Sequence, residues 1–104
     1  MPGIDFDELR RCVTMEHVLR LLDFTPRRRF GSQLRGLCPI HHSSSERSRT
    51  FSVNLASGRY YCFKCGSFGH QLELWAAANQ LNLYAASLDL CHRLAIDVPW
   101  IRHR

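Results

Sequence analysis

Cys38-Pro39-Ile40-His41 and Cys62-Phe63-Lys64-Cys65 are the two stretches that decide the fold of this chain. Each places two candidate metal ligands two residues apart on a tight turn, so that both ligand atoms face the same side. Two such turns facing each other complete a tetrahedron around one zinc ion. Zinc closed off by four protein ligands is structural, because catalysis needs a vacant position for water or substrate. The spacing predicts one structural Zn²⁺ bound by Cys38, His41, Cys62 and Cys65.

Two alternatives to this ligand set stay open at the level of sequence. His42 follows His41 directly, so either histidine could bind the metal, and the two-residue spacing from Cys38 selects His41. Reduced or disulfide-bonded cysteines without metal would also give cysteine pairs, but they do not explain why one ligand position holds histidine.

Cysteine usage favours a reducing compartment. The chain has five cysteines, an odd number, and its first residues mix charged and apolar side chains instead of forming a signal peptide. We therefore expect a cytoplasmic protein without a disulfide framework. Cys12 and Cys91 lie outside the motif in helical patterns, and we expect both to be small buried side chains.

Size and charge narrow the class of protein. A chain of 104 residues with 45% hydrophobic residues forms one domain with a small core. Its net charge is +5 and its pI about 9.3, which suggests a polyanionic partner such as nucleic acid. A GC-rich genome, which raises the arginine content of its proteins, would give the same charge without such a partner. No apolar run approaches the ~18 residues needed to span a bilayer.

The hydrophobic periodicity predicts an α+β fold, a zinc ribbon with helices on both sides. Helical spacing covers residues 4–22, with Thr14 capping the second of two short helices, and returns in 70–79 and 84–95. Residues 30–37 and 50–56 read as strands, and 59–62 as a return strand after the Ser57-Gly58 turn. We expect a single domain, 1–104, made of an N-terminal helical segment (1–29), the zinc ribbon (30–69) and a C-terminal helix pair (70–98).

The motif resembles the zinc-binding domain of bacterial-type DNA primases, whose finger has the ligand order Cys-His-Cys-Cys. The matching stretches cover about residues 4–98 and include Cys38-Pro39-Ile40-His41, Phe51-Ser52-Val53 and Tyr61-Cys62-Phe63-Lys64-Cys65-Gly66. Three features depart from the family pattern. The segment between His41 and Phe51 is about three residues longer than usual, Arg49-Thr50 replaces the usual Pro-Ser, and His70 replaces the usual Asp.

The sequence shows no catalytic core like that of the primases, so we expect a binding protein and not an enzyme. The nine acidic residues form no spaced carboxylate cluster of the kind a two-metal polymerase needs. We therefore expect a stand-alone finger that contacts single-stranded template DNA and works with a separately encoded primase core or helicase. A protein–protein interaction module of a replication or mobile-element complex is the alternative.

Candidate DNA contacts lie beside the ligand pairs, because cations meet phosphates there and aromatic rings offer stacking faces. We assign Phe63 and Tyr61 to packing around the zinc. The expected nucleic-acid contacts are Arg47, Arg49, Arg59, Tyr60 and Lys64.

Overall fold

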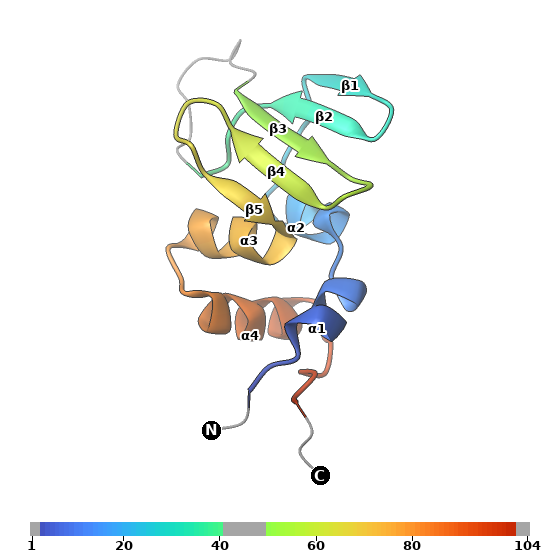
Figure 1. Cartoon of the computed structure of the whole chain (residues 1–104), viewed down its shortest axis with the longest axis vertical. Helices are drawn as coiled ribbons and strands as arrows, with labels where there is room; N and C mark the ends of the chain where they lie inside the picture. The colour runs from blue at the N-terminus through green and yellow to red at the C-terminus, as the bar shows by residue number, and fades with distance from the viewer. Residues whose placement is uncertain (1–2, 41–49, 102–104) are drawn as a thin grey trace.

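A five-stranded antiparallel sheet and a group of helices are stacked end to end in a body 51 × 27 × 22 Å across (Figure 1). The structure is a computed structural model, and it describes residues 3–40 and 50–101. The elements in these ranges are α1 (Phe6–Cys12), α2 (Met15–Leu21), β1 (Arg28–Phe30), β2 (Gln33–Gly36), β3 (Phe51–Asn54), β4 (Arg59–Cys62), β5 (Phe68–His70), α3 (Gln71–Asn79) and α4 (Leu83–Arg93). The predicted α+β class is confirmed.

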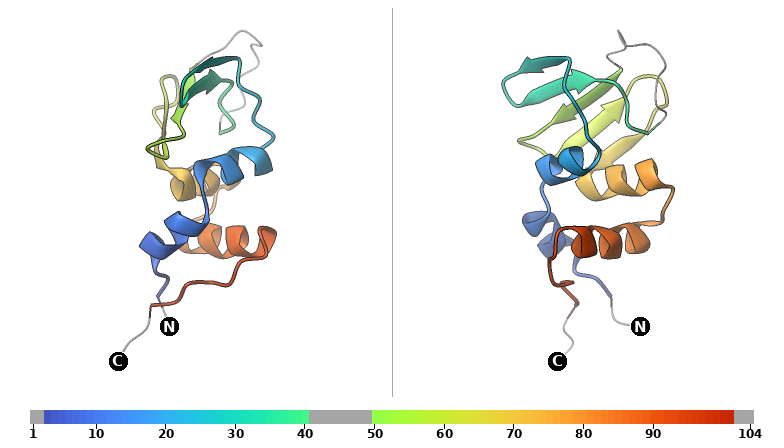
Figure 2. Two further views of the ribbon diagram at one scale, coloured as in Figure 1. Left: turned by 90° about the vertical axis from the view of Figure 1, so that its right-hand side faces the viewer. Right: turned by 180° about the vertical axis from the view of Figure 1, so that it is seen from behind.

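The strands form a simple meander in the order β1-β2-β3-β4-β5, each antiparallel to its neighbour. Alternation along β3 and β4 buries Phe51, Val53 and Tyr60 on the inner face and leaves the residues between them on the outer face. The predicted hairpin is confirmed, with Asn54 opposite Arg59. The segment between α2 and β1 crosses the inner face (Figure 2), where the Phe24 ring meets the Phe51 ring edge-on with centroids 5.3 Å apart.

Two strands differ from the sequence prediction. Residues 30–37, expected to be one strand, instead contain a turn at Gly31, whose φ of +58° suits glycine, and the chain pairs on both sides of it. Arg28 and Arg29 therefore lie in the edge strand β1. Strand β5 was not predicted, because three residues are too few to show alternation.

Helix α2 begins directly after its predicted cap, Thr14. Thr14 Oγ1 accepts a hydrogen bond from the His17 amide, and the Thr14 amide donates to His17 Nδ1, both at 3.2 Å. This reciprocal pair satisfies amides that the first helical turn leaves free. Helix α3 packs against β5 and α4 packs against α3, so α3 lies between the sheet and the last helix (Figure 1).

One apolar core runs through both layers. It joins Phe51 of the sheet to Leu9, Leu72, Leu74 and Leu90 of the helices, all fully buried. Within the described ranges, no helix is long and apolar enough to cross a membrane.

The two cysteines outside the motif differ in exposure. Cys91 is buried as expected, and burial, followed by the nearby Cys12, raises the pKa of its thiol. Cys12 is exposed, contrary to the prediction, because as the last residue of α1 it lies on the solvent side of the helix end.

The segments before α1 and after α4 lie side by side. Ile4 and Trp100 form an antiparallel bridge. The Asp5 amide donates to the Pro99 carbonyl, and the Ile101 amide donates to the Gly3 carbonyl, each at 2.7 Å. These contacts join the two ends of the described chain at the side of the helices far from the sheet (Figure 1).

Candidate metal centre

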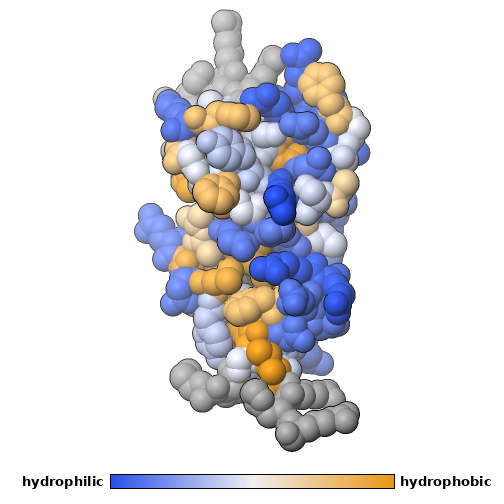
Figure 3. Space-filling view, viewed as in Figure 1, coloured by the Kyte–Doolittle hydropathy of each residue, from blue (hydrophilic) through white to orange (hydrophobic). Residues whose placement is uncertain are grey.

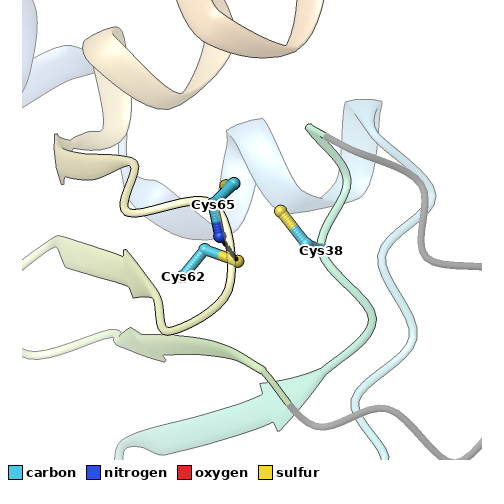
Figure 4. A group of neighbouring side chains, drawn as sticks. All are labelled: Cys38, Cys62 and Cys65. Atoms are coloured by element: carbon cyan, nitrogen blue, oxygen red, sulfur yellow. Dashed lines mark hydrogen bonds between the residues drawn. The ribbon is translucent and has the colours of Figure 1, made fainter.

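Three cysteine sulfurs converge where two loops meet at the edge of the sheet. The Sγ atoms of Cys38, Cys62 and Cys65 all lie within 4.8 Å of one another. Cys38 follows β2, Cys62 ends β4, and Cys65 lies in the turn between β4 and β5 (Figure 4). Cys38 and Cys62 are 1% and 0% exposed, whereas Cys65 is open to solvent.

The second loop is held by backbone hydrogen bonds around Cys62. Its carbonyl accepts from the Gly66 amide and its amide donates to the Ser67 carbonyl, both at 2.9 Å. The Cys65 amide donates to Cys62 Sγ at 3.4 Å (Figure 4). The Ile40 amide makes the same contact, also 3.4 Å, to Cys38 Sγ in the first loop. Both loops therefore direct amide hydrogens at a sulfur, which suits a thiolate.

The environment of Cys62 favours its ionised form. Burial alone would raise the pKa of this thiol, but hydrogen bonds from the backbone of Cys65 and Lys64 outweigh it. The hydroxyl of Thr50, with Oγ1 3.8 Å from Cys62 Sγ, acts in the same direction. Together they lower the pKa of Cys62 from 9.0 to about 7. Zinc binds the thiolate, so this lowered pKa suits a metal ligand.

The three sulfurs fit a zinc ion. A Zn–S distance of about 2.3 Å in a tetrahedron separates two sulfurs by about 3.8 Å, which the cluster reaches with small inward movements. Such a site would hold the two loops together and supply structural stability. The predicted fourth ligand, His41, lies outside the described residues, and so do His42, Arg47 and Arg49.

The structure separates the other predicted DNA contacts. Arg59 is exposed on the outer face of β4, and Lys64 is exposed in the loop after it. Tyr60 is only 4% exposed, and its ring stacks on Phe51. The prediction that Tyr60 contacts nucleic acid is corrected, because the β4 alternation turns its ring into the core. Its hydroxyl is hydrogen-bonded to Ser67 Oγ at 2.8 Å.

The two aromatic residues expected in the core are at the surface. Tyr61 is 42% exposed and Phe63 is 63% exposed, with ring centroids 4.9 Å apart. The guanidinium of Arg35 lies 5.1 Å from the Phe63 ring centroid. A cation held over an exposed ring in this way is a stabilising pair, and it keeps both groups at the surface.

These side chains belong to an aligned row across the outer face of the sheet. Register places one residue from each strand side by side. The row contains Arg28, Arg35, Ser52, Tyr61 and Phe68. At the edge strand, the Arg28 guanidinium lies 5.2 Å from the centroid of the exposed Phe30 ring. Sequence reasoning missed Phe30, Arg35 and Phe68, although the two-residue spacing of Gln33 and Arg35 around buried Leu34 signals an outer face.

Figure 3 shows this outer face, with rings among hydrophilic side chains over the sheet. The segment after α2 covers the opposite face and leaves this one open (Figure 2). The exposed rings and cations therefore share one uncovered surface beside the cysteine cluster.

Comparison with known proteins places this arrangement in a family. The sequence model of the CHC2 zinc finger matches residues 4–104. The chain belongs to the CHC2 zinc finger family. The resemblance inferred from the motif is thereby confirmed, and the cluster of Cys38, Cys62 and Cys65 lies within the matched residues.

Relatives of this CHC2 zinc finger are much longer proteins. A DNA primase of Helicobacter pylori strain J99 is 36% identical over 87 residues, which are 84% of this chain and 15% of the primase. A DNA primase of Synechocystis is 33% identical over 73% of this chain and 12% of its own length.

A solved structure of the Aquifex aeolicus primase, containing its zinc binding and RNA polymerase domains, superposes with a TM-score of 0.72. It is 25% identical, and the match covers 92% of this chain and 23% of that one. The chain thus spans about an eighth to a quarter of these proteins, and what it shares with them is the zinc-binding domain.

Proposed function

We propose that this CHC2 zinc finger binds single-stranded DNA on the outer face of its sheet and presents it as template to a primase catalytic core, or to a helicase. The observation that carries the proposal is the row of exposed rings and arginines on that face. In this function the protein performs no catalysis itself.

The metal would fix the binding surface. We infer that Cys38, His41, Cys62 and Cys65 bind one Zn²⁺, which joins the loop after β2 to the loop after β4. These loops flank the row, so zinc would hold Phe63 next to Arg35. We also infer that residues 1–104 act as one domain, with the helical segments 1–29 and 70–98 supporting the ribbon.

The chemistry of the face suits single strands. The five strands contain no acidic residue, so nothing on them repels phosphate. Base–aromatic stacking contributes about 1–3 kcal/mol per base and tolerates any sequence. Tyr61, Phe63 and Phe68 offer such rings, and Arg28, Arg59 and Lys64 offer cations to the backbone.

The test is fluorescence anisotropy with a labelled oligothymidylate across a salt series. About three or four phosphate contacts give a log-log slope near −2 to −3, at ~0.7 per contact. The double variant Arg59→Glu with Lys64→Glu should bind much more weakly and keep its zinc. Arg11→Glu with Arg20→Glu, on α1 and α2, changes the net charge equally and should retain binding. Equal losses in both double variants would contradict a specific face.

A protein-interaction module is the second candidate. Three apolar side chains are exposed at the helical end, Leu81 at 38%, Trp100 at 40% and Ile101 at 45%. An apolar surface there suits a protein partner better than DNA. Undetectable oligonucleotide binding at low salt would favour this function over the first.

A further inference from the structure

One half of the outer face is hollowed and nearly neutral. A surface hollow of about 780 Å³ opens over β4, β5 and the start of α3. Tyr61 and Phe68, direct partners in the β4–β5 register, are two of its aromatic linings. Its charged groups include Arg59 and the carboxylate of Glu73. Phe68 is 72% exposed, so a flat ring could lie against it from outside.

The two halves of the face differ in the ligand group that they suit. On the β1–β2 side, Arg28 and Arg35 are held over the Phe30 and Phe63 rings, and these cations suit phosphates. In the hollow, the Glu73 carboxylate repels a phosphate, whereas the aromatic linings favour a neutral planar ring. A single strand that places its backbone over the arginine side would bring an unstacked base to the hollow.

The polar groups of the hollow indicate which base it would bind. Within residues 3–40 and 50–101, the Arg59 guanidinium has no ion pair and no side-chain hydrogen bond, so its donors are available. Gln33 donates through Nε2 to Ser52 Oγ at 2.9 Å, which leaves its Oε1 as an acceptor. Guanine presents two adjacent acceptors, O6 and N7, that match an arginine fork, whereas adenine presents one acceptor and one donor.

We propose that the hollow over β4 and β5 is a base-binding subsite that takes one unstacked guanine, stacked against Phe68 and read by Arg59. This inference rests on the proposed binding of single-stranded DNA and adds a base preference to it.

The experiment compares three labelled oligonucleotides in the zinc-loaded protein: oligothymidylate, and the same strand with a single central guanine or adenine. The guanine strand should bind at least about fivefold more tightly than the other two, the lower end expected for one bidentate contact. Replacing guanine by 7-deazaguanine, which keeps the ring but lacks the N7 acceptor, should remove most of this preference.

Two conservative variants separate base reading from charge. Arg59→Lys keeps the charge but loses the fork. It should abolish the guanine preference and leave the salt slope nearly unchanged, because the number of cations is the same. Arg28→Lys, on the phosphate side, should keep the preference. Urea midpoints and zinc content of both variants should match the parent protein.

Three results would overturn the inference. Tight but base-independent binding would remove the guanine subsite and leave the proposed function standing. A guanine preference that survives Arg59→Lys would show that another residue reads the base. Undetectable binding of every strand at low salt would reject the proposed function, and the subsite with it.

Discussion

Replacing Gly69 by alanine should strongly destabilise the junction between the sheet and the helices. Gly69 has a φ of +147°, which residues with a side chain rarely adopt. It lies in β5, the strand that directly precedes α3. A Cβ added there would meet Glu73 Cβ at 2.8 Å. Glu73 Cβ is fixed to helix α3, so the clash cannot be relieved by a side-chain rotation alone.

The size of the effect follows from two contributions. A strained backbone conformation costs about 1–3 kcal/mol, and a forced displacement in a packed region costs about 1–3 kcal/mol more. We expect a loss of about 2–6 kcal/mol, a large share of the 5–15 kcal/mol typical of a domain.

Gly31→Ala is the matched control. Gly31 also has a positive φ, +58°, but a Cβ there would have nothing within 4 Å. Its cost should be the left-handed conformation alone, about 1–2 kcal/mol, partly offset by lower entropy of the unfolded chain.

Urea unfolding of the zinc-loaded proteins, followed by circular dichroism, measures both changes. A difference of ~3 kcal/mol between the variants moves the midpoint by ~1–3 M. If Gly69→Ala is no less stable than Gly31→Ala, the close approach of β5 to α3 does not constrain the fold and the reasoning is wrong.

Outcomes are expected for three further variants. Cys62→Ser should lose its zinc by elemental analysis and much of its β structure, since metal binding and folding are coupled; a full zinc complement would exclude Cys62 as a ligand. Tyr60→Phe removes the hydrogen bond to Ser67 and should cost about 1 kcal/mol at neutral pH. Burial of the Tyr60 side chain raises its pKa above 10.0, and the hydrogen bond to Ser67 offsets only part of this increase. At high pH the folded state therefore keeps a proton that the unfolded state loses. Stability should therefore fall as pH rises above 10 in the parent and less steeply in Tyr60→Phe; parallel pH profiles would refute this. Trp75→Phe loses the 2.8 Å bond from Nε1 to Asp89 and should cost about 1.5–3 kcal/mol by thermal unfolding, whereas an unchanged midpoint would mean that the bond contributes nothing.

The elements predicted correctly are those with strong local signals. Thr14 could be placed at a helix start because its side chain caps the next turn whatever the tertiary structure. The alternation of Phe51 and Val53 identified β3, because one face of that strand is buried. The cysteine cluster could be predicted because the spacing of the ligands is set by the local geometry of a tight turn and does not depend on the rest of the fold.

The misassigned residues depend on contacts that sequence spacing does not encode. Tyr60 and Tyr61 are adjacent aromatics, and only the side of β4 that faces the helices decides which one is buried. Phe63 lies beyond the end of β4, where its exposure follows from its pairing with Arg35 of another strand. The outer row needed the register of all five strands, which short segments do not fix by themselves.

The bridge between Ile4 and Trp100 determines how the molecule responds to mechanical load. Because the two end segments run antiparallel and lie side by side, a force pulling them apart would first separate the Asp5–Pro99 and Ile101–Gly3 hydrogen bonds. The load would next reach α1 and α4, and only afterwards the sheet and the cysteine loops. A handle attached at either end would therefore leave the outer face of the sheet accessible, because the sheet lies at the opposite end of the molecule (Figure 1).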